Sequence, residues 1–266
     1  MIDIHEIDSM EILLDTLNSL PNHFIYRGHA DASWPLTSSL ERVIGSSWNE
    51  ENAILSEERT LDVFKSKFHL YDKINIVPDS KLAWLSLMQH YGAPTRLLDF
   101  TESPYAALYF SIEFYCPQSK KDFAVYALDY SAMMDKSIAK IAASRPSFNE
   151  TRASIYPKRD AIFDEVVDPG KYDIAWITEP TMLNARLDRQ AGSFILSGNR
   201  GSRIRDILES ELYHDVAMYK YVFPAKLYQG VYALLRKMNL TSKTLYGDLD
   251  GLARSLKMEL QVYLGQ

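Results

Sequence analysis

The sequence predicts an α+β fold: one domain whose mixed or antiparallel sheet core is flanked by helices, with helices at both ends of the chain. Short apolar runs bounded by turn residues indicate strands, and apolar residues spaced three and four positions apart indicate helices. The 266 residues are 47% hydrophobic and contain no internal repeat, low-complexity segment or evident linker. A single domain over residues 1–266 is therefore the simplest organisation.

The first 71 residues alternate between helix and strand patterns. A helix is predicted over residues 6–19 from the spacing of its apolar positions, and Pro21 ends it. The run FIYR at residues 24–27 then reads as a buried strand. The segment SSLERVI at residues 38–44 has helical spacing again, and the charged stretch at residues 49–71 is mostly compatible with a helix.

The middle of the chain carries the strongest pattern changes. A helix that Gly92 stops precedes a short apolar run at residues 96–100, which indicates a buried strand. Ser103 supplies an N-cap and Pro104 a first-turn proline for the next helix. The run FAVYALD at residues 123–129 then predicts a further central strand.

The later part of the chain is read from its prolines, glycines and leucines. Residues 131–172 are the least patterned, and prolines interrupt weak helices there, so we expect loops or an insertion. The segment at residues 192–198 is a short strand between glycines. The last 45 residues predict two helices; their apolar positions are Leu227, Val231, Leu234 and Met238 on the first, and Leu249, Leu252, Leu256 and Leu260 on the second.

Charge, cysteine content and hydropathy restrict the class of protein. The formal net charge is −6, so the chain lacks the overall basic field of sequence-independent nucleic-acid binders, although a local basic patch is compatible with it. Cys116 is the single cysteine, which excludes an internal disulfide and suits a reducing compartment. We read it as a small buried apolar residue. No apolar run is long enough to span a membrane, so the expected location is the cytoplasm.

Familiar ligand-binding signatures are missing from the sequence. It contains no G-x-G-x-x-G, no G-x-x-x-x-G-K-[ST], no H-E-x-x-H and no cysteine pair. The six histidines are scattered without ligand-like spacing. We therefore expect no metal site.

Polar residues cluster where the predicted apolar strands begin or end. Polar groups at strand ends that border a cleft are a common way for a sheet to present a site, because the strands hold them rigidly. Gly28 would let a ligand approach the backbone closely. The residues in question are Arg27, Arg96, Asp99, Thr101, Ser103, Gln190 and Gly192.

Several of these residues also have a purely structural interpretation. Arg96 and Asp99 would satisfy each other as a structural ion pair, since buried charges are generally paired. Tyr105 suits the core as well as a site, and His90 suits a hydrogen-bonded helix end. Arg27 is either a buried structural partner or a guanidinium placed for a bidentate grip on phosphate or carboxylate.

Four blocks of the sequence together resemble a known family. They are YRG, LMQHYGAPTRLLDFTESPYAALYFS, RLDRQAGSFIL and TLYGDLDGLARSLK, and they occur in this order from residue 24 to about residue 257. They are similar to the successive blocks of the FRG domain, named for its Phe-Arg-Gly triplet, with Tyr26 in the aromatic position. The resemblance implies one FRG domain with its core at about residues 20–257.

The order of the blocks is in turn similar to the ADP-ribosyltransferase fold of the diphtheria-toxin type, which implies a split mixed or antiparallel sheet. In that type the first motif grips the ribose or phosphate of NAD, and the second holds the nicotinamide end. Arg27 and Gly28 match the first motif, and Thr101 and Tyr105 match the second. The full set of residues expected at NAD is Arg27, Gly28, His90, Arg96, Asp99, Thr101, Ser103 and Tyr105.

The third motif is where the chain departs from that pattern. The type carries a catalytic glutamate there, whereas the nearest match in RQAGSFIL is Gln190. A carboxylate stabilises the positive charge that develops as nicotinamide leaves, and a glutamine does so only through its dipole. Glu179, which lies upstream, is a possible substitute. The expected catalytic residues are Arg27, Thr101 and Gln190.

The resemblance therefore implies an NAD-dependent ADP-ribosyltransferase that modifies a macromolecule, as a bacterial toxin or antiviral-defence effector with a possible antitoxin partner. Two alternatives stay open: an NAD glycohydrolase and a non-catalytic module that binds a nucleotide or a peptide. The segment from Arg186 to Arg205 is locally basic and flanks the third motif, which favours a nucleic-acid acceptor, with RNA ahead of DNA, over protein. Its basic residues are Arg186, Arg189, Arg200, Arg203 and Arg205.

Overall fold

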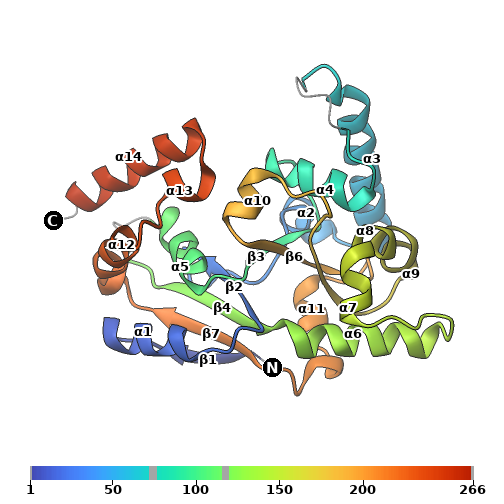
Figure 1. Ribbon diagram of the computed structural model, residues 1–266, viewed down its shortest axis with the longest axis horizontal. Coiled ribbons are helices and arrows are strands. Elements are labelled where there is room, and N and C mark those ends of the chain that lie inside the picture. Colours follow the sequence, from blue (N-terminus) through green and yellow to red (C-terminus); the bar gives the residue numbers. More distant parts are fainter. Residues whose placement is uncertain (1, 72–76, 116–119, 265–266) are drawn as a thin grey trace.

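A computed structural model describes residues 2–71, 77–115 and 120–264, and it has the predicted α+β composition (Figure 1). Its described strands form one seven-stranded sheet in the order β1-β7-β4-β2-β3-β6-β5. The strands are β1 (Asp3–Glu6), β2 (Phe24–His29), β3 (Leu98–Thr101), β4 (Phe123–Asp129), β5 (Ala175–Thr178), β6 (Gly192–Ser197) and β7 (Met218–Phe223).

The sheet is mixed. β1 runs parallel to β7, and the other neighbouring pairs are antiparallel. The four strands predicted at residues 24–27, 96–100, 123–129 and 193–196 are all present in this sheet, which confirms the prediction, although β3 begins two residues late. The described strands are continuous in hydrogen bonding, so the split that the resemblance implied is not seen among them.

β2 lies at the centre of the sheet. Tyr26 is paired with Thr101 of β3, and Arg27 is paired with Tyr126 of β4. This register sets Arg27 beside the end of β3 and so brings two polar sequence blocks together that are far apart in the chain. The predicted proximity of Arg27 and Thr101 is confirmed.

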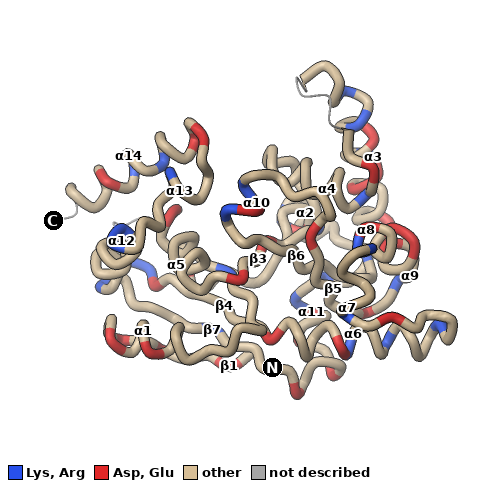
Figure 2. The backbone as a smooth tube through the Cα atoms, viewed as in Figure 1, with Lys and Arg blue, Asp and Glu red and all other residues tan. Residues whose placement is uncertain are grey.

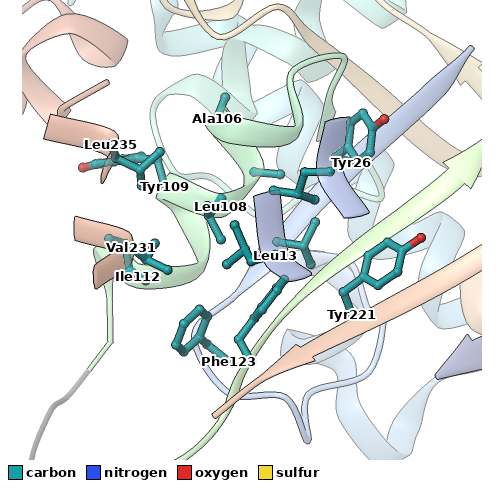
Figure 3. Close-up of a cluster of buried hydrophobic side chains, with 14 of the residues drawn as sticks. Leu13, Tyr26, Ala106, Leu108, Tyr109, Ile112, Phe123, Tyr221, Val231 and Leu235 are labelled. Carbon is teal, nitrogen blue, oxygen red and sulfur yellow. The ribbon is translucent and has the colours of Figure 1, made fainter. Parts of the chain in front are cut away.

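The sheet buries both of its faces, as the unbroken apolar runs of its central strands require. Tyr26, Phe123 and Val125 point to one hydrophobic cluster, while their neighbours Ile25 and Tyr126 point to another on the opposite face. Figure 3 shows the first cluster, where side chains of β2, β4 and β7 meet Leu13, Leu108 and Val231 from helices.

Helices from both ends of the chain cover this first face. Ser9 caps the first of them, and Ser103 with Pro104 begins another, as predicted. The last 45 residues hold a short extra helix in addition to the two predicted. These helices are α1 (Met10–Ser19), α5 (Pro104–Glu113), α12 (Tyr228–Lys237), α13 (Ser242–Tyr246) and α14 (Leu249–Leu264).

The second helical group packs around β5 and β6. Its core contains the fully buried Trp176, Leu85 and Phe163. In Figure 1 this group lies on the opposite side of the molecule from α14. Its helices are α2 (Ser39–Ile44), α3 (Glu50–Phe68), α4 (Lys81–His90), α6 (Tyr130–Ser144), α7 (Arg152–Ile155), α8 (Arg159–Ile162), α9 (Asp168–Gly170), α10 (Ala185–Arg189) and α11 (Ile204–Leu208).

The expectation of loops over residues 131–172 is wrong, while the alternative of an insertion stays a prediction. This region contains the long helix α6 and a run of short helices, including a π-helix at Phe163–Val167. The prolines that suggested interruption lie outside helix interiors: Pro146 follows the end of α6, while Pro157 and Pro169 occupy first-turn positions. Ile141 and Phe163 are fully buried, so the region belongs to the core.

The four leucines that share a face of α14 do not enter the core. Leu249 is 82% exposed and Leu260 is 61% exposed, and Leu252 and Leu256 are exposed as well. α14 is attached through Met258 instead, whose sulfur accepts a hydrogen bond from Tyr109. The prediction of the helix is confirmed, while its apolar row faces outward.

Three further observations concern the described residues only. None of their helices has the length and apolar character that crossing a membrane requires. Within the same residues, no group of three His, Cys, Asp or Glu side chains is arranged to hold a metal ion. Cys116, which we expected to be a small buried residue, lies outside the described residues.

Candidate functional site

A cavity of about 870 Å³ lies where β2, β3 and β6 meet helices α2, α4, α5, α10 and α13. A cavity of this size accommodates a drug-sized or dinucleotide-sized ligand. It brings together residues from the first, second and third predicted motifs. The predicted site residues that line it are Arg27, Gly28, His90, Asp99, Thr101 and Gln190, and Gly192 lines it too.

Arg27 reaches this cavity from the end of β2. Its Nε donates to Nε2 of His29 at 3.0 Å, and its Nη1 donates to the carbonyl oxygen of Asp99 at 2.6 Å. The Asp99 carboxylate is 3.8 Å away and largely exposed. Burial lowers the pKa of Arg27, and the neighbouring Asp99 opposes that shift. The arginine is therefore oriented by protein groups, with donors left over for a ligand.

His29 fixes the direction of Arg27. Nε2 of His29 accepts from Arg27, so Nδ1 carries the ring proton and donates to the carbonyl oxygen of Trp34 at 3.2 Å. Burial, together with the charge of Arg27, lowers the pKa of His29 to about 3. The imidazole is thus a neutral acceptor under ordinary conditions.

Gly28 lines the cavity, and the packing of helix α5 against β2 requires a residue without a side chain at this position. A Cβ atom at this position would come within 2.0 Å of the carbonyl oxygen of Ala107 and 2.4 Å of the amide nitrogen of Ser111, both in α5. We expected Gly28 to allow a ligand to approach the backbone. In the structure, helix α5 makes this close approach, because its backbone packs directly against Gly28 in β2.

Thr101 joins the second and third blocks. Its Oγ1 donates to the carbonyl oxygen of Gln190 at 2.6 Å and accepts from the amide of Ser103 at 3.0 Å. The Gln190 side chain lines the cavity and donates to the carbonyl oxygen of Leu245 at 3.4 Å. The Thr101 hydroxyl is therefore used in holding the cavity wall together.

Arg96 is placed away from the cavity, in a buried ion cluster. Its Nε lies 3.1 Å from Glu57, and its Nη2 pairs with Asp168. Lys81 and Arg200 complete the cluster from α4 and the segment after β6. Arg96 therefore forms a structural ion pair, as one interpretation of the sequence expected. Its partners are Glu57 and Asp168, and the expected partner Asp99 faces Arg27 instead.

Three other predicted residues also lie outside the lining of the cavity. Ser103 caps α5, and Tyr105 donates from its hydroxyl to Oδ1 of Asn18 at 2.7 Å. Glu179, the possible substitute for the missing glutamate, lies 3.4 Å from Arg159. None of the three is among the residues that line the cavity.

The basic segment from Arg186 to Arg205 does not form one surface. Arg200 belongs to the buried ion cluster, and Arg205 pairs with Glu209 on α11. Arg189 donates to the carbonyl oxygen of Tyr246. Only Arg186 and Arg203 of the five line the cavity. Figure 2 likewise shows acidic positions mixed with basic ones along α10 and its surroundings.

One basic residue at the cavity, Arg42, was not predicted from the sequence, and it lies there with Arg203. Arg42 donates to the carbonyl oxygen of Thr37 at 2.6 Å, and Arg203 donates to that of Gly45 at 2.6 Å, so the two bracket helix α2. The charge of Arg42 contributes to the lowered pKa of Arg27, and both residues line the cavity. Arg42 stands on a predicted amphipathic helix, where an arginine gives no signal of a site.

A second missed group surrounds Glu113, the last residue of α5. Tyr246 donates from its hydroxyl to Oε2 of Glu113 at 2.7 Å, and Arg254 lies 3.4 Å from Oε1. Glu113, Tyr246 and Arg186 all line the cavity. Glu113 had one usable signal, because it is the only charge in the apolar helix PYAALYFSIE.

The comparisons with known proteins concern the first half of this site. Residues 22–120 match the family model of the FRG domain. This stretch is therefore similar to the FRG domain. It contributes β2, β3, α4 and α5, with Arg27, His90 and Thr101, while Gln190 and Tyr246 of the cavity lie beyond the FRG match. No curated protein and no solved structure is significantly similar to the chain.

Proposed function

We propose that the protein is an NAD-dependent ADP-ribosyltransferase, which cleaves the bond between nicotinamide and ribose and transfers ADP-ribose to a macromolecule. The observation that carries the proposal is the convergence of Arg27, Arg42 and Arg203 on one cavity at the sheet ends. Three guanidiniums with free donors suit the two phosphates of a dinucleotide, because a guanidinium binds phosphate oxygens in a bidentate manner.

The same cavity offers surfaces for the aromatic ends of NAD. Trp34, Phe110, Phe114 and Phe194 line it together with Tyr246. Aromatic side chains bind flat heteroaromatic rings by stacking, so they supply affinity at the nicotinamide and adenine ends while the arginines bind the centre of the molecule. The neutral His29 acts through Arg27, whose guanidinium it orients.

The reaction proposed is a dissociative substitution. The site holds NAD in a bent conformation, the bond to nicotinamide lengthens, and positive charge develops on the ribose before the acceptor attacks. Arg27 fixes the phosphates while the reacting carbon is left accessible. We propose a nucleic-acid acceptor, with RNA ahead of DNA and protein, supported by Arg186 at the cavity wall. A role as a bacterial toxin or antiviral effector, with an antitoxin partner, is part of the same proposal.

Two alternative functions make different predictions. An NAD glycohydrolase uses the same cavity with water as the acceptor, so it releases nicotinamide without labelling a macromolecule. A non-catalytic module binds a nucleotide or peptide and releases nothing, an alternative that the neutral Gln190 in the third block favours.

The experiment that tests the proposal uses NAD labelled in its adenylate part, incubated with the protein and separately with cell protein, DNA or RNA. Nicotinamide release with label on a macromolecule supports the transferase. Nicotinamide release without such label supports the glycohydrolase, and NAD binding without release supports the binding module.

A further inference from the structure

We infer that Glu113 is the catalytic carboxylate of this cavity, an inference that rests on the proposed NAD-cleaving function. Glu113 ends helix α5, its side chain is 2% exposed, and it lines the cavity that Arg27 and Gln190 also line. Two other carboxylates of the described residues line the cavity. Glu41 accepts from the amides of Ser38 and Ile204, while Asp99 is largely exposed and accepts from the side-chain amide of Gln89.

The position of Glu113 is unfavourable for the fold alone. A carboxylate at the last residue of a helix meets the negative end of the helix dipole. Burial adds a desolvation cost, and it raises the pKa of Glu113 despite the nearby Arg254 and Arg186. Glu113 thus lowers the stability of the fold. Buried acids in such unfavourable positions occur frequently at catalytic sites, where their chemical role explains their presence.

The surroundings of Glu113 hold its carboxylate in a fixed orientation. Tyr246 donates to Oε2, and Arg254 approaches Oε1. Two guanidiniums contact the Tyr246 ring, with Arg186 4.2 Å and Arg254 4.9 Å from its centroid. Tyr109 is the remaining titratable neighbour, one helical turn back on α5. The carboxylate is thus positioned before any ligand binds.

The chemistry assigned to Glu113 follows the charges of the reaction. The bond between C1′ of the ribose and the nicotinamide nitrogen breaks, and its electron pair neutralises the positive pyridinium ring. The Glu113 carboxylate stabilises the positive charge that develops at C1′. The acceptor then forms a bond to C1′ through its lone pair, and the proton that it loses passes to Glu113.

The first test compares Glu113→Gln with the wild-type protein in nicotinamide release and in NAD binding by calorimetry. We expect E113Q to bind NAD within about threefold of wild type and to release nicotinamide about 100-fold more slowly, because the lost charge acts mainly in the transition state. Release within about threefold of wild type would overturn the inference while leaving the proposed function intact. A wild-type protein that binds or cleaves no NAD overturns the proposed function itself.

Glu57→Gln is the matched control. The Glu57 side chain is also 2% exposed and paired with an arginine, but it lies in the ion cluster outside the cavity. We expect E57Q to lower stability as much as E113Q does, and to keep the nicotinamide release of the folded fraction. Equal loss of release in both variants would show that loss of a buried ion pair, rather than loss of a catalytic charge, explains E113Q.

The second test uses Tyr246→Phe and remains informative if E113Q does not fold. The Tyr246 hydroxyl lowers the pKa of Glu113 by donating to its charged form. Removing that hydroxyl raises the pKa, so a reaction that needs ionised Glu113 loses rate at a higher pH. We expect the acid limb of nicotinamide release to move upward by about one pH unit. An unmoved limb contradicts the catalytic assignment, since a structural role alone would not shift it.

Discussion

The guanidinium of Arg27 donates to the imidazole of its strand neighbour His29, two residues along, with 3.0 Å between Nε and Nε2. This hydrogen bond requires a neutral imidazole, because a protonated His29 would present a donor to a donor. The cavity therefore contains an arginine whose direction is set by a histidine that resists protonation.

The first prediction concerns the pH dependence of stability that His29 causes. Its pKa is about 3 in the folded protein, whereas a histidine in an unfolded chain has its ordinary pKa of 6.5, so between these values only the unfolded chain takes up a proton. The contribution of His29 to the free energy of unfolding is therefore fully present above pH 6.5 and is lost as the pH decreases. At pH 5 the free energy of unfolding is lower by about 2 kcal/mol because of this group. Urea unfolding at several pH values measures the slope.

His29→Gln removes the titrating group and keeps a side chain able to accept from Arg27. We expect the stability of this variant to depend less steeply on pH between 6.5 and 5 than that of wild type. Equal slopes for the two proteins would show that His29 is protonated in the folded state.

The second prediction concerns the contact between β2 and α5. Gly28→Ala drives a Cβ atom into the backbone of α5 at 2.0 Å, and neither backbone can yield as a flexible side chain does. We expect the free energy of unfolding to fall by about 3 kcal/mol or more. Gly230→Ala is the control, because its Cβ atom would meet only the flexible end of Met10 at 3.0 Å. G230A should stay within about 1 kcal/mol of wild type in urea unfolding.

The third prediction concerns the different contributions of Arg200 and Arg205, two arginines of the basic segment, to the free energy of unfolding. Arg200 is paired with Asp168 and Glu58 and lies 3.8 Å from Glu57, so Arg200→Ala leaves these three carboxylates with two cations, Lys81 and Arg96, and an uncompensated negative charge in the cluster. We expect a loss of about 3–5 kcal/mol in unfolding free energy. Arg205→Ala removes an exposed pair with Glu209 and should cost less than about 1 kcal/mol. Similar midpoints in urea for the two variants would argue against the ion cluster.

The fourth prediction concerns the acceptor. If Arg186 and the cavity rim bind phosphates of RNA, transfer of labelled ADP-ribose to RNA should weaken steeply as salt rises, because each phosphate contact releases counterions. Nicotinamide release with no acceptor present should change much less over the same salt range. Label that appears on protein alone, or transfer to RNA that ignores salt, contradicts a nucleic-acid acceptor.

The sequence was sufficient to predict four of the described strands, β2, β3, β4 and β6, and helices in the first 114 and last 45 residues, because each depends on a local pattern. It did not predict β1, β5 or β7. The runs at residues 24–27 and 123–129 alternate between two buried faces, and Ser103 with Pro104 marks the start of α5 within a few residues. The helices at residues 130–170 were missed because we read Pro146 and Pro157 as interruptions, whereas they stand at helix boundaries.

The candidate site was less predictable, because its partners are distant in sequence. Arg96 pairs with Asp168, 72 positions away, and no local pattern distinguishes that partner from the nearby Asp99. Glu113 meets Tyr246 across 133 positions. Arg27 and Thr101 were found because each follows a short apolar run, and the register of β2 and β3 brings them together, although β2 continues past Arg27 to His29.

The measurement that tests the central claim most directly is nicotinamide release from NAD by wild-type protein and by Arg27→Ala, with Arg205→Ala as the control. We expect wild type and R205A to release nicotinamide at similar rates. R27A should lose NAD binding and release while its unfolding free energy falls by only about 1–2 kcal/mol, because Asp99 is left exposed rather than buried. A folded R27A that binds and cleaves NAD at the wild-type rate would contradict the assignment of this cavity.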